Sequence, residues 1–187
     1  MARGFLEGSA WPFSGTNLIE PHGGIRMHEI KIIIEKELLL PMLSDLGRSH
    51  HFAYERVGFV YCDFNAKEKT LTARAFVPVA DEDYLRDRYV GACIGTRPIR
   101  NAICAALSGS AAVFHVHIHD HFGLPFFSRV DEKFYEELVP ALRAVNPQVP
   151  HGAFVFSKDG FRARLWGSKG LAIDQEFIGM DFSKEEK

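Results

Sequence analysis

The fold and the candidate site are organised around one stretch, AVFHVHIHDHFGLPFFSRVD, which runs from Ala112 to Asp131. Four histidines alternate with other residues directly after its apolar start: His115, His117, His119 and His121. Successive side chains of a β-strand point to opposite faces, so the odd-numbered positions share one face. The stretch therefore predicts a strand that carries a row of imidazoles on one side.

This row predicts a metal site rather than ordinary packing. Neutral imidazole is the commonest metal ligand, and two imidazoles at i and i+2 can bind one ion at an open strand end. Burying several imidazoles without partners would cost about 1–3 kcal/mol each. Ser128 and Asp131 are spaced as an N-cap and the third residue of a helix, which alone would indicate only capping. Beside the row, the same geometry can aim the Asp131 carboxylate at the histidines.

Composition indicates one domain with a specific partner. The 187 residues suffice for one well-packed domain and are too few for two ordinary ones. Lys and Arg number 22 against 24 Asp and Glu, which predicts no general affinity for nucleic acid or for a membrane. Three cysteines form neither a disulfide framework nor a C-x-x-C pair and are expected to be reduced: Cys62, Cys93 and Cys104. No secretion signal or membrane span is predicted, so we expect a cytoplasmic protein.

The first half of the chain predicts an arm followed by strands and a helix. Residues 1–27 are rich in Gly, Pro, Ser and Asn and lack periodicity, so we expect a loosely structured N-terminal arm there. Apolar periodicity and turn residues then predict a strand from Glu29, a helix over 37–47, a strand over 54–64, its hairpin partner over 70–79 and a strand over 88–94. Glu55 lies at the mouth of the strand over 54–64.

The second half mixes helices and strands. The predicted elements are a helix over 99–107 capped by Thr96, the histidine strand from Ser110 to His117 or His119, a helix over 128–144, a hairpin over 151–166 and a strand over 173–182. Asp159 and Gly160 are expected to supply the positive φ of the hairpin turn. There is no regular βαβα rhythm, which predicts an α+β domain over residues 28–182, with a mixed, mainly antiparallel sheet flanked by helices. Residues 183–187 are expected to form a frayed tail.

These residues resemble the signature of the JAMM (JAB/MPN) zinc metalloprotease family. Its pattern is a glutamate at a strand start followed by Gly and an apolar residue, then a helix, a strand that ends in His-x-His, and Ser-x-x-Asp. Here the glutamate stands in Glu55-Arg-Val-Gly-Phe59, and the other parts follow in the same order. The resemblance covers roughly residues 29–170 and implies a single MPN/JAB-like domain of the bacterial, stand-alone type.

The resemblance also implies roles for individual residues. It implies one zinc ion held by His117, His119 and Asp131, with a water in the fourth position. Glu55 would be the general base, and Ser128 would stabilise the oxyanion. Three protein ligands leave zinc an open position, and the ion lowers the pKa of its water to about 7. A nearby carboxylate outside the ligand set can then remove a proton at neutral pH.

The implied activity is that of an isopeptidase or peptidase. It would remove a ubiquitin-like protein from its conjugate or trim the C-terminus of that protein. Activating and conjugating enzymes of the same pathway would be further partners, by analogy with the family.

The chain departs from the family pattern at two points. The family usually has His-Ser/Thr-His-Pro, whereas no proline follows either candidate pair here. The second histidine of the family usually precedes the aspartate by eleven positions, and the gap here is 131 − 119 = 12 from His119 or 131 − 117 = 14 from His117. Spacing favours the pair His117 and His119. The continuous apolar lead into His115 favours the alternative pair, His115 and His117.

Two other readings remain. A non-catalytic MPN-type binding or scaffold module would have no need of Glu55, but the altered surroundings of the histidines keep this alternative open. A different metal enzyme is the other alternative. An amidohydrolase barrel would need roughly 250 residues, more than the chain has. A cupin-like barrel would not call for helices at 96–107 and 128–144.

Overall fold

The computed structural model describes residues 10–13, 30–87, 89–109, 111–167 and 172–178. Three α-helices lie within these ranges: α1 (Lys36–Leu46), α2 (Thr96–Gly109) and α3 (Arg129–Val145). The strands are β1 (Ala10–Phe13), β2 (Lys31–Glu35), β3 (Val57–Asn65), β4 (Thr70–Pro78), β5 (Ala112–Ile118), β6 (His151–Phe156), β7 (Gly160–Trp166) and β8 (Ala172–Ile178). A short 3₁₀ turn, Asp81–Asp83, follows β4.

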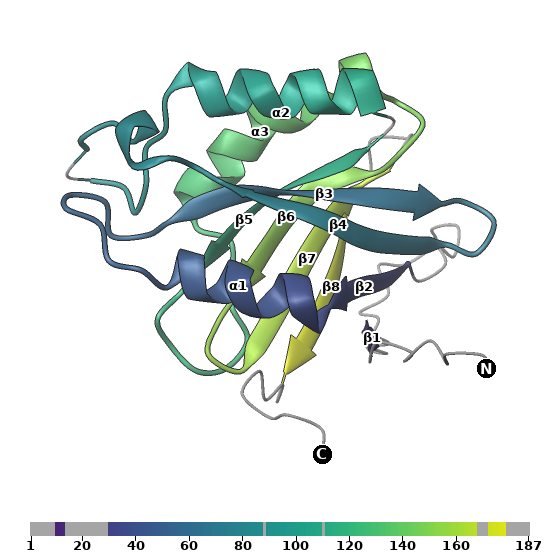
Figure 1. The fold of residues 1–187 in the computed structure, drawn as a ribbon, viewed down its shortest axis with the longest axis horizontal. Coiled ribbons are helices and arrows are strands. Elements are labelled where there is room, and N and C mark those ends of the chain that lie inside the picture. Colours follow the sequence, from purple (N-terminus) through teal and green to yellow (C-terminus); the bar gives the residue numbers. More distant parts are fainter. Residues whose placement is uncertain (1–9, 14–29, 88, 110, 168–171, 179–187) are drawn as a thin grey trace, which may run out of the picture.

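All eight strands belong to one sheet with the order β1-β2-β4-β3-β5-β6-β7-β8 (Figure 1). The pairs β2–β4 and β5–β6 are parallel, and the other five adjacent pairs are antiparallel. The histidine strand β5 lies in the interior of this sheet, between β3 and β6. Six of its seven residues are buried, because α1 packs with one face of the strand and α2 and α3 pack with the other.

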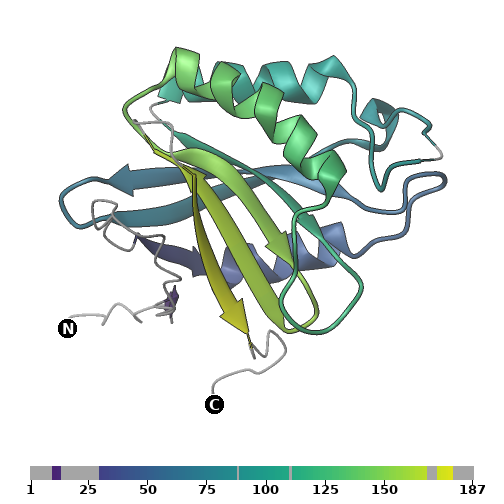
Figure 2. The same ribbon diagram turned by 180° about the vertical axis from the view of Figure 1, so that it is seen from behind.

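Helices cover both faces of the sheet. Helices α2 and α3 lie together over one face, whereas α1 lies against the other (Figures 1 and 2). The residues of β5 divide between these faces with the period of two that a strand requires. Phe114 and Val116 join the cluster that includes α1, whereas Val113 packs with α2 and α3. His115 lies on the same side as Val113, since its ring contacts Tyr135 of α3.

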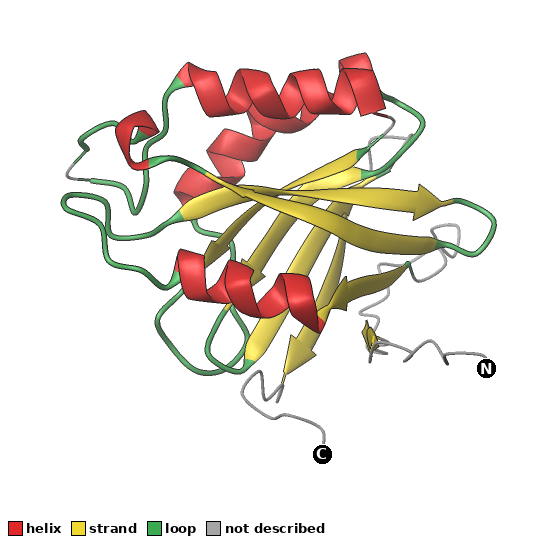
Figure 3. Cartoon of the chain, in the orientation of Figure 1, coloured by secondary structure: helices red, strands yellow, loops and turns green. Residues whose placement is uncertain are grey.

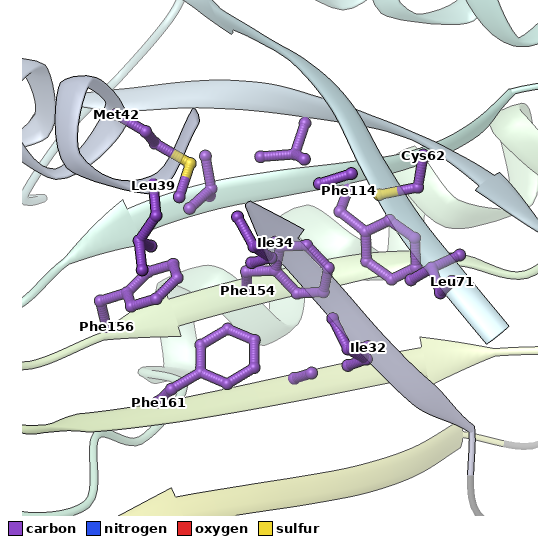
Figure 4. Close-up of a cluster of buried hydrophobic side chains, with 14 of the residues drawn as sticks. Ile32, Ile34, Leu39, Met42, Cys62, Leu71, Phe114, Phe154, Phe156 and Phe161 are labelled. Atoms are coloured by element: carbon purple, nitrogen blue, oxygen red, sulfur yellow. The ribbon is translucent and has the colours of Figure 1, made fainter. Parts of the chain in front are cut away.

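The larger core forms because the sheet curls. Ile32 and Ile34 of β2 share one buried cluster with Phe161 of β7, although four strands separate β2 from β7 in the sheet order. Figure 4 shows these side chains converging with Leu39 and Met42 of α1. Burial of this kind contributes about 1.5–3 kcal/mol for each large apolar side chain. The curl fixes β5 in a rigid setting on which a precise site can be built.

Helices and strands mix without a βαβα rhythm, in agreement with the predicted α+β class (Figure 3). The predicted strand over 88–94 is wrong for the described residues 89–94, in which only Ile94 makes a bridge, to Tyr84. The strand predicted from residue 54 begins at Val57, so Glu55 precedes it in a loop. Both differences arise because residues 79–95 form an irregular connection that packs on the start of β3.

The hairpin of β6 and β7 forms as predicted, but not for the reason given. Gly160 is not in the left-handed region, and the described glycine with positive φ is Gly123. A Cβ at Gly160 would lie 2.6 Å from the Gly123 carbonyl oxygen. Gly160 is therefore required by the close approach of the 120–125 loop.

Strand β1 lies within the segment predicted as an arm and pairs antiparallel with β2. The rest of the predicted arm, residues 1–9 and 14–27, and the predicted tail at 183–187 lie outside the described residues. Among the helices in the described part of the chain, none has the length and apolar character needed to cross a bilayer.

Candidate metal centre

His117 and His119 lie at the C-terminal end of β5. His117 pairs with Val57 of β3 and with Val155 of β6, so its side chain is enclosed and 0 % exposed. His119 directly follows the strand, and its backbone N–H donates to the carbonyl of Phe156 at 2.8 Å. The Nε2 atoms of the two imidazoles are 3.2 Å apart. The strand thus ends by aiming two ring nitrogens at one point.

Asp131 approaches the same point from the first turn of α3. Ser128 caps this helix: its Oγ accepts a hydrogen bond from the Asp131 N–H at 3.2 Å, and the Asp131 Oδ2 accepts one from the Ser128 N–H at 2.7 Å. This reciprocal capping box fixes the carboxylate at the helix start. Oδ2 also lies 3.6 Å from His117 Nε2. Capping and proximity to the histidines are therefore combined in one side chain.

Glu55 completes the cluster from the loop before β3. Its Oε1 lies 3.9 Å from His119 Nε2. Three residues, Glu55, His117 and His119, each have one possible ligand atom within 4.8 Å of the other two. These residues form a group that can hold a metal ion. The structure thus brings together four residues that the sequence analysis named: Glu55, His117, His119 and Asp131. Asp131 lies next to His117, beside the group of three.

The surroundings hold these groups close to neutral charge. Burial, with a contribution from Asp131, raises the pKa of Glu55 from 4.5 to about 7. Burial also lowers the pKa of His117 and of His119 below 6.5. At pH 7 both imidazoles are therefore neutral and can donate a lone pair to a metal, while Glu55 exchanges a proton readily.

The donor atoms are compatible with a metal ion. Ligands of a tetrahedral zinc site, each about 2.0–2.1 Å from the metal, are about 3.3–3.4 Å apart. The His117–His119 separation of 3.2 Å and the His117–Asp131 separation of 3.6 Å bracket this value. The distance from Glu55 Oε1 to His119 Nε2 is longer, 3.9 Å, but Glu55 is the carboxylate that lies within 4.8 Å of both imidazoles. Two nitrogens and one carboxylate oxygen form a ligand combination that catalytic zinc commonly has.

The hydrogen bonding of His117 also indicates a missing partner. Its Nδ1 is buried and has no hydrogen-bond partner among the described residues. Its Nε2 faces another neutral imidazole, and only one of two facing nitrogens can donate to the other. Leaving a buried polar atom unpaired costs about 1–3 kcal/mol. A cation shared by the two Nε2 atoms would satisfy both of them.

His115, the member of the alternative pair, points elsewhere. Its Nδ1 lies 3.2 Å from the Tyr135 hydroxyl, and its ring packs edge-on against Phe59 and Phe134. Burial lowers its pKa, so it is a neutral side chain of the core beneath the site. The structure thus brings His117 and His119 together and directs His115 toward α3.

The segment after β5 is fastened to the turn between β6 and β7. The Lys158 N–H donates to the His121 carbonyl at 2.9 Å, and the Ser157 hydroxyl donates to the Gly123 carbonyl at 2.6 Å. The Gly123 N–H donates to Asp159 Oδ1 at 2.6 Å. These bonds hold the chain that leaves His119, so the second imidazole is fixed although it lies outside the strand.

One residue that sequence reasoning missed lies directly against Glu55. A Cβ built on Gly91 would be 2.5 Å from the Cδ of Glu55. The two residues are 36 positions apart (91 − 55 = 36) across the hairpin of β3 and β4. No local pattern in the sequence signals this contact.

Comparison with known proteins adds no family assignment, since no protein-family model matches the chain and a search of curated proteins finds no match.

Proposed function

We propose that this protein is a zinc-dependent hydrolase that cleaves a peptide or isopeptide bond of a ubiquitin-like protein. The observation that carries the proposal is the convergence of Glu55, His117 and His119 within 4.8 Å, with Asp131 3.6 Å from His117. Two neutral imidazoles and a carboxylate provide a set of metal ligands, and a second carboxylate, whose pKa is raised, lies beside them. A bound metal ion together with a general base is an arrangement typical of enzymes that hydrolyse their substrates.

In the proposed mechanism His117, His119 and Asp131 hold the ion. A zinc ion there supplies a Lewis acid and brings the pKa of a bound water to about 7. Glu55 Oε1 accepts a proton of the attacking water and passes it to the leaving amine nitrogen. In the metal-free protein, burial raises the pKa of Glu55. A carboxylate with this affinity for protons suits a group that first accepts a proton and then returns it.

Ser128 is proposed to stabilise the oxyanion formed in the attack. Its Oγ accepts the N–H of Asp131, and an accepting hydroxyl still carries a proton that it can donate. Its place at the start of α3 adds the positive end of the helix dipole near the developing charge.

The fold and the ubiquitin-like substrate are proposed from the resemblance to JAMM (JAB/MPN) proteases. Support comes from the order of the site residues along the chain, from a mixed sheet with helices on both faces and from the interior strand β5, which contains His117 and is directly followed by His119. A ubiquitin-like protein with a C-terminal extension, or its conjugate, is the expected substrate.

The test is cleavage of a C-terminally extended ubiquitin-like protein by zinc-loaded enzyme. We expect Glu55→Gln to reduce kcat by at least about 10²-fold, because proton transfer by a positioned side chain contributes about 10²–10⁴-fold. The matched control is Glu137→Gln, an exposed glutamate of α3, which should keep full activity. Chelation should abolish turnover, and zinc should restore it.

Two outcomes would overturn the proposal. Turnover that persists in Glu55→Gln, or after stringent chelation, would remove the proposed chemistry. Stoichiometric zinc without turnover of any ubiquitin-like substrate would favour a binding or scaffold module instead.

A further inference from the structure

The connection between β4 and α2 contacts Glu55 through its backbone. The carbonyl oxygen of Gly91 accepts hydrogen bonds from two successive amides, the Tyr54 N–H at 2.8 Å and the Glu55 N–H at 3.0 Å. Glu55 lies in a loop before β3, where no strand pairing fixes it. These two bonds therefore hold the backbone of Glu55 in place of a sheet ladder.

Gly91 also lies directly against the Glu55 carboxylate. A Cβ added to Gly91 would be 2.5 Å from Cδ, 2.5 Å from Oε2 and 2.9 Å from Oε1 of Glu55. Real Cβ atoms essentially never show contacts this short. The three nearest atoms all belong to the Glu55 carboxylate group, so a side chain at position 91 would first meet that carboxylate.

Backbone geometry gives no other reason for a glycine here. The φ of Gly91 lies outside the left-handed region, so another residue could adopt the same backbone. What the position requires is the absence of a side chain. This separates Gly91 from Gly123, which has a φ of 86° and nothing within 4 Å of its added Cβ.

The segment that carries Gly91 is itself anchored near Glu55. The Leu85 N–H donates to the Cys93 carbonyl at 2.8 Å and closes the base of the loop. The neighbouring Tyr84 hydroxyl accepts the Val57 N–H at 2.8 Å, two residues after Glu55. The segment that carries Gly91 is therefore held against Glu55 by hydrogen bonds, one of which joins Tyr84 to the first residue of β3.

The residue after Glu55, Arg56, makes a second set of hydrogen bonds that hold this segment. Arg56 is 3 % exposed, and its guanidinium donates to Asp81 at 2.7 Å and to the Arg48 carbonyl at 3.0 Å. This bond network joins the segment before β3 to the 3₁₀ turn after β4. Glu55 therefore lies between two points at which its segment is bonded to the connection between β4 and α2: the backbone bonds to Gly91 and the ion pair of Arg56 with Asp81.

We propose that Gly91 is a positioning residue that sets where the Glu55 carboxylate stands relative to His119. The inference rests on the proposed function for its effect on turnover, and on contacts alone for its effect on the fold. The Gly91 carbonyl fixes the backbone of Glu55, and the absence of a Cβ at Gly91 leaves room for the Glu55 carboxylate. A methyl group at this position moves the carboxylate away from the water that it must deprotonate.

The structural part is tested by a double-mutant cycle on the Tm of the metal-free protein. We expect Gly91→Ala to lower the Tm by about 1–3 degrees in the wild-type background, a small loss because the clashing atoms are the end of a flexible side chain. The loss should be smaller when Glu55 is Ala, because the clash is then gone. Gly167→Ala, at a glycine with nothing within 4 Å of its added Cβ, should leave the Tm unchanged within about a degree. Equal losses in both backgrounds would overturn the proposal.

The functional part is tested by kinetics of the zinc-loaded protein with the extended ubiquitin-like substrate. Gly91→Ala should lower kcat by about 10–100-fold, the effect of an ångström-scale displacement, with KM and bound zinc unchanged. Glu55→Asp has a shorter side chain and should lose little or nothing further when combined with Gly91→Ala.

Unchanged kcat in Gly91→Ala would overturn the positioning role even if the Tm values couple. A wild-type protein without turnover would end the proposed function alone, and the Tm cycle would still decide whether Gly91 sets the place of the carboxylate.

Discussion

Two buried histidines on adjacent strands of the sheet, His151 and His117, have different hydrogen-bond partners. His151, at the start of β6, is 0 % exposed; its Nδ1 accepts the Val113 N–H at 3.1 Å, and its Nε2 donates to the Asn146 carbonyl at 2.9 Å. His117, on the adjacent strand β5, is equally buried. Its Nε2 faces His119, and its Nδ1 has no partner in the described part of the chain.

Burial alone does not distinguish these sites, since it lowers the pKa of both His151 and His117 and keeps both rings neutral. The difference lies in the partners. Backbone groups satisfy both nitrogens of His151, which joins β5 to the end of α3. Among the described residues no backbone group pairs with His117 Nδ1, and the side chains of His119 and Asp131 lie close to its Nε2 instead. A buried histidine that the fold leaves unsatisfied is the better indicator of a ligand site.

The largest expected effect is a difference in the free energy of unfolding between variants of the two histidines, His151 and His117. In metal-free protein, we expect His151→Ala to lower the free energy of unfolding by about 2–5 kcal/mol, and by about 1–3 kcal/mol more than His117→Ala. Both changes remove the same volume, so the difference reports the lost hydrogen bonds. Urea unfolding in the presence of a chelator measures it. An equal or larger loss in His117→Ala would show that His117 is already satisfied.

The next effect is the response to zinc. Zinc at 100 times its Kd should raise the free energy of unfolding by about 2.7 kcal/mol, and this increase should disappear in His119→Ala. Thermal unfolding with and without zinc measures the change. The matched control is His51→Ala, an exposed histidine outside the cluster, which should keep the full response. A similar stabilisation of His119→Ala would place the ion elsewhere.

A smaller effect is expected from pH. The pKa of Glu55 is raised to about 7 in the folded protein, so between pH 4.5 and 7 the folded state holds more protons at this group than the unfolded state. Its contribution to stability is therefore lost as pH rises through 7. The histidines act in the opposite sense: their lowered pKa values make stability fall as pH falls below 6.5.

We therefore expect metal-free Glu55→Gln to lose about 1–2 kcal/mol more stability than wild type between pH 7 and pH 5. Urea unfolding at the two pH values measures this loss. Equal losses would mean that Glu55 titrates near its ordinary pKa.

The smallest effect concerns Ser128, which the fold uses as a cap. We expect Ser128→Ala to lower the free energy of unfolding by about 1 kcal/mol, with one zinc still bound per chain. The control is Ser108→Ala: the Ser108 hydroxyl only donates to the Cys104 carbonyl within the exposed last turn of α2, so the change should be within about 0.5 kcal/mol. If Ser128→Ala is as neutral as this control, the capping box does not stabilise α3.

Local patterns predicted much of this arrangement. Alternation placed His115 and His117 on one face because a strand has a period of two, and Ser-x-x-Asp predicted the capping box that the structure contains. The helix over 128–144 follows equally local signals, whereas the hairpin over 151–166 forms where predicted although Gly160 is required by a contact with Gly123. The alternation, the capping box and the helix depend on neighbours within a few residues, which a sequence displays directly.

Features set by distant contacts could not be predicted. The start of β3 depends on the connection over 79–95, which contacts it through Tyr84 and Gly91. The choice among the histidines depends on Tyr135, which withdraws His115 toward α3. Neither contact has a spacing rule, because each joins segments whose approach is decided by the curl of the sheet.

The short strand β1 has a consequence for how the protein behaves among copies of itself. It covers the hydrogen-bonding side of β2, and it is only four residues long and contains Pro12, which has no amide proton. Short length and proline both discourage another chain from extending a sheet at that border. Removal of residues 10–13 would leave the isoleucine-rich β2 as the outermost strand, and that truncated protein should self-associate more than the full chain.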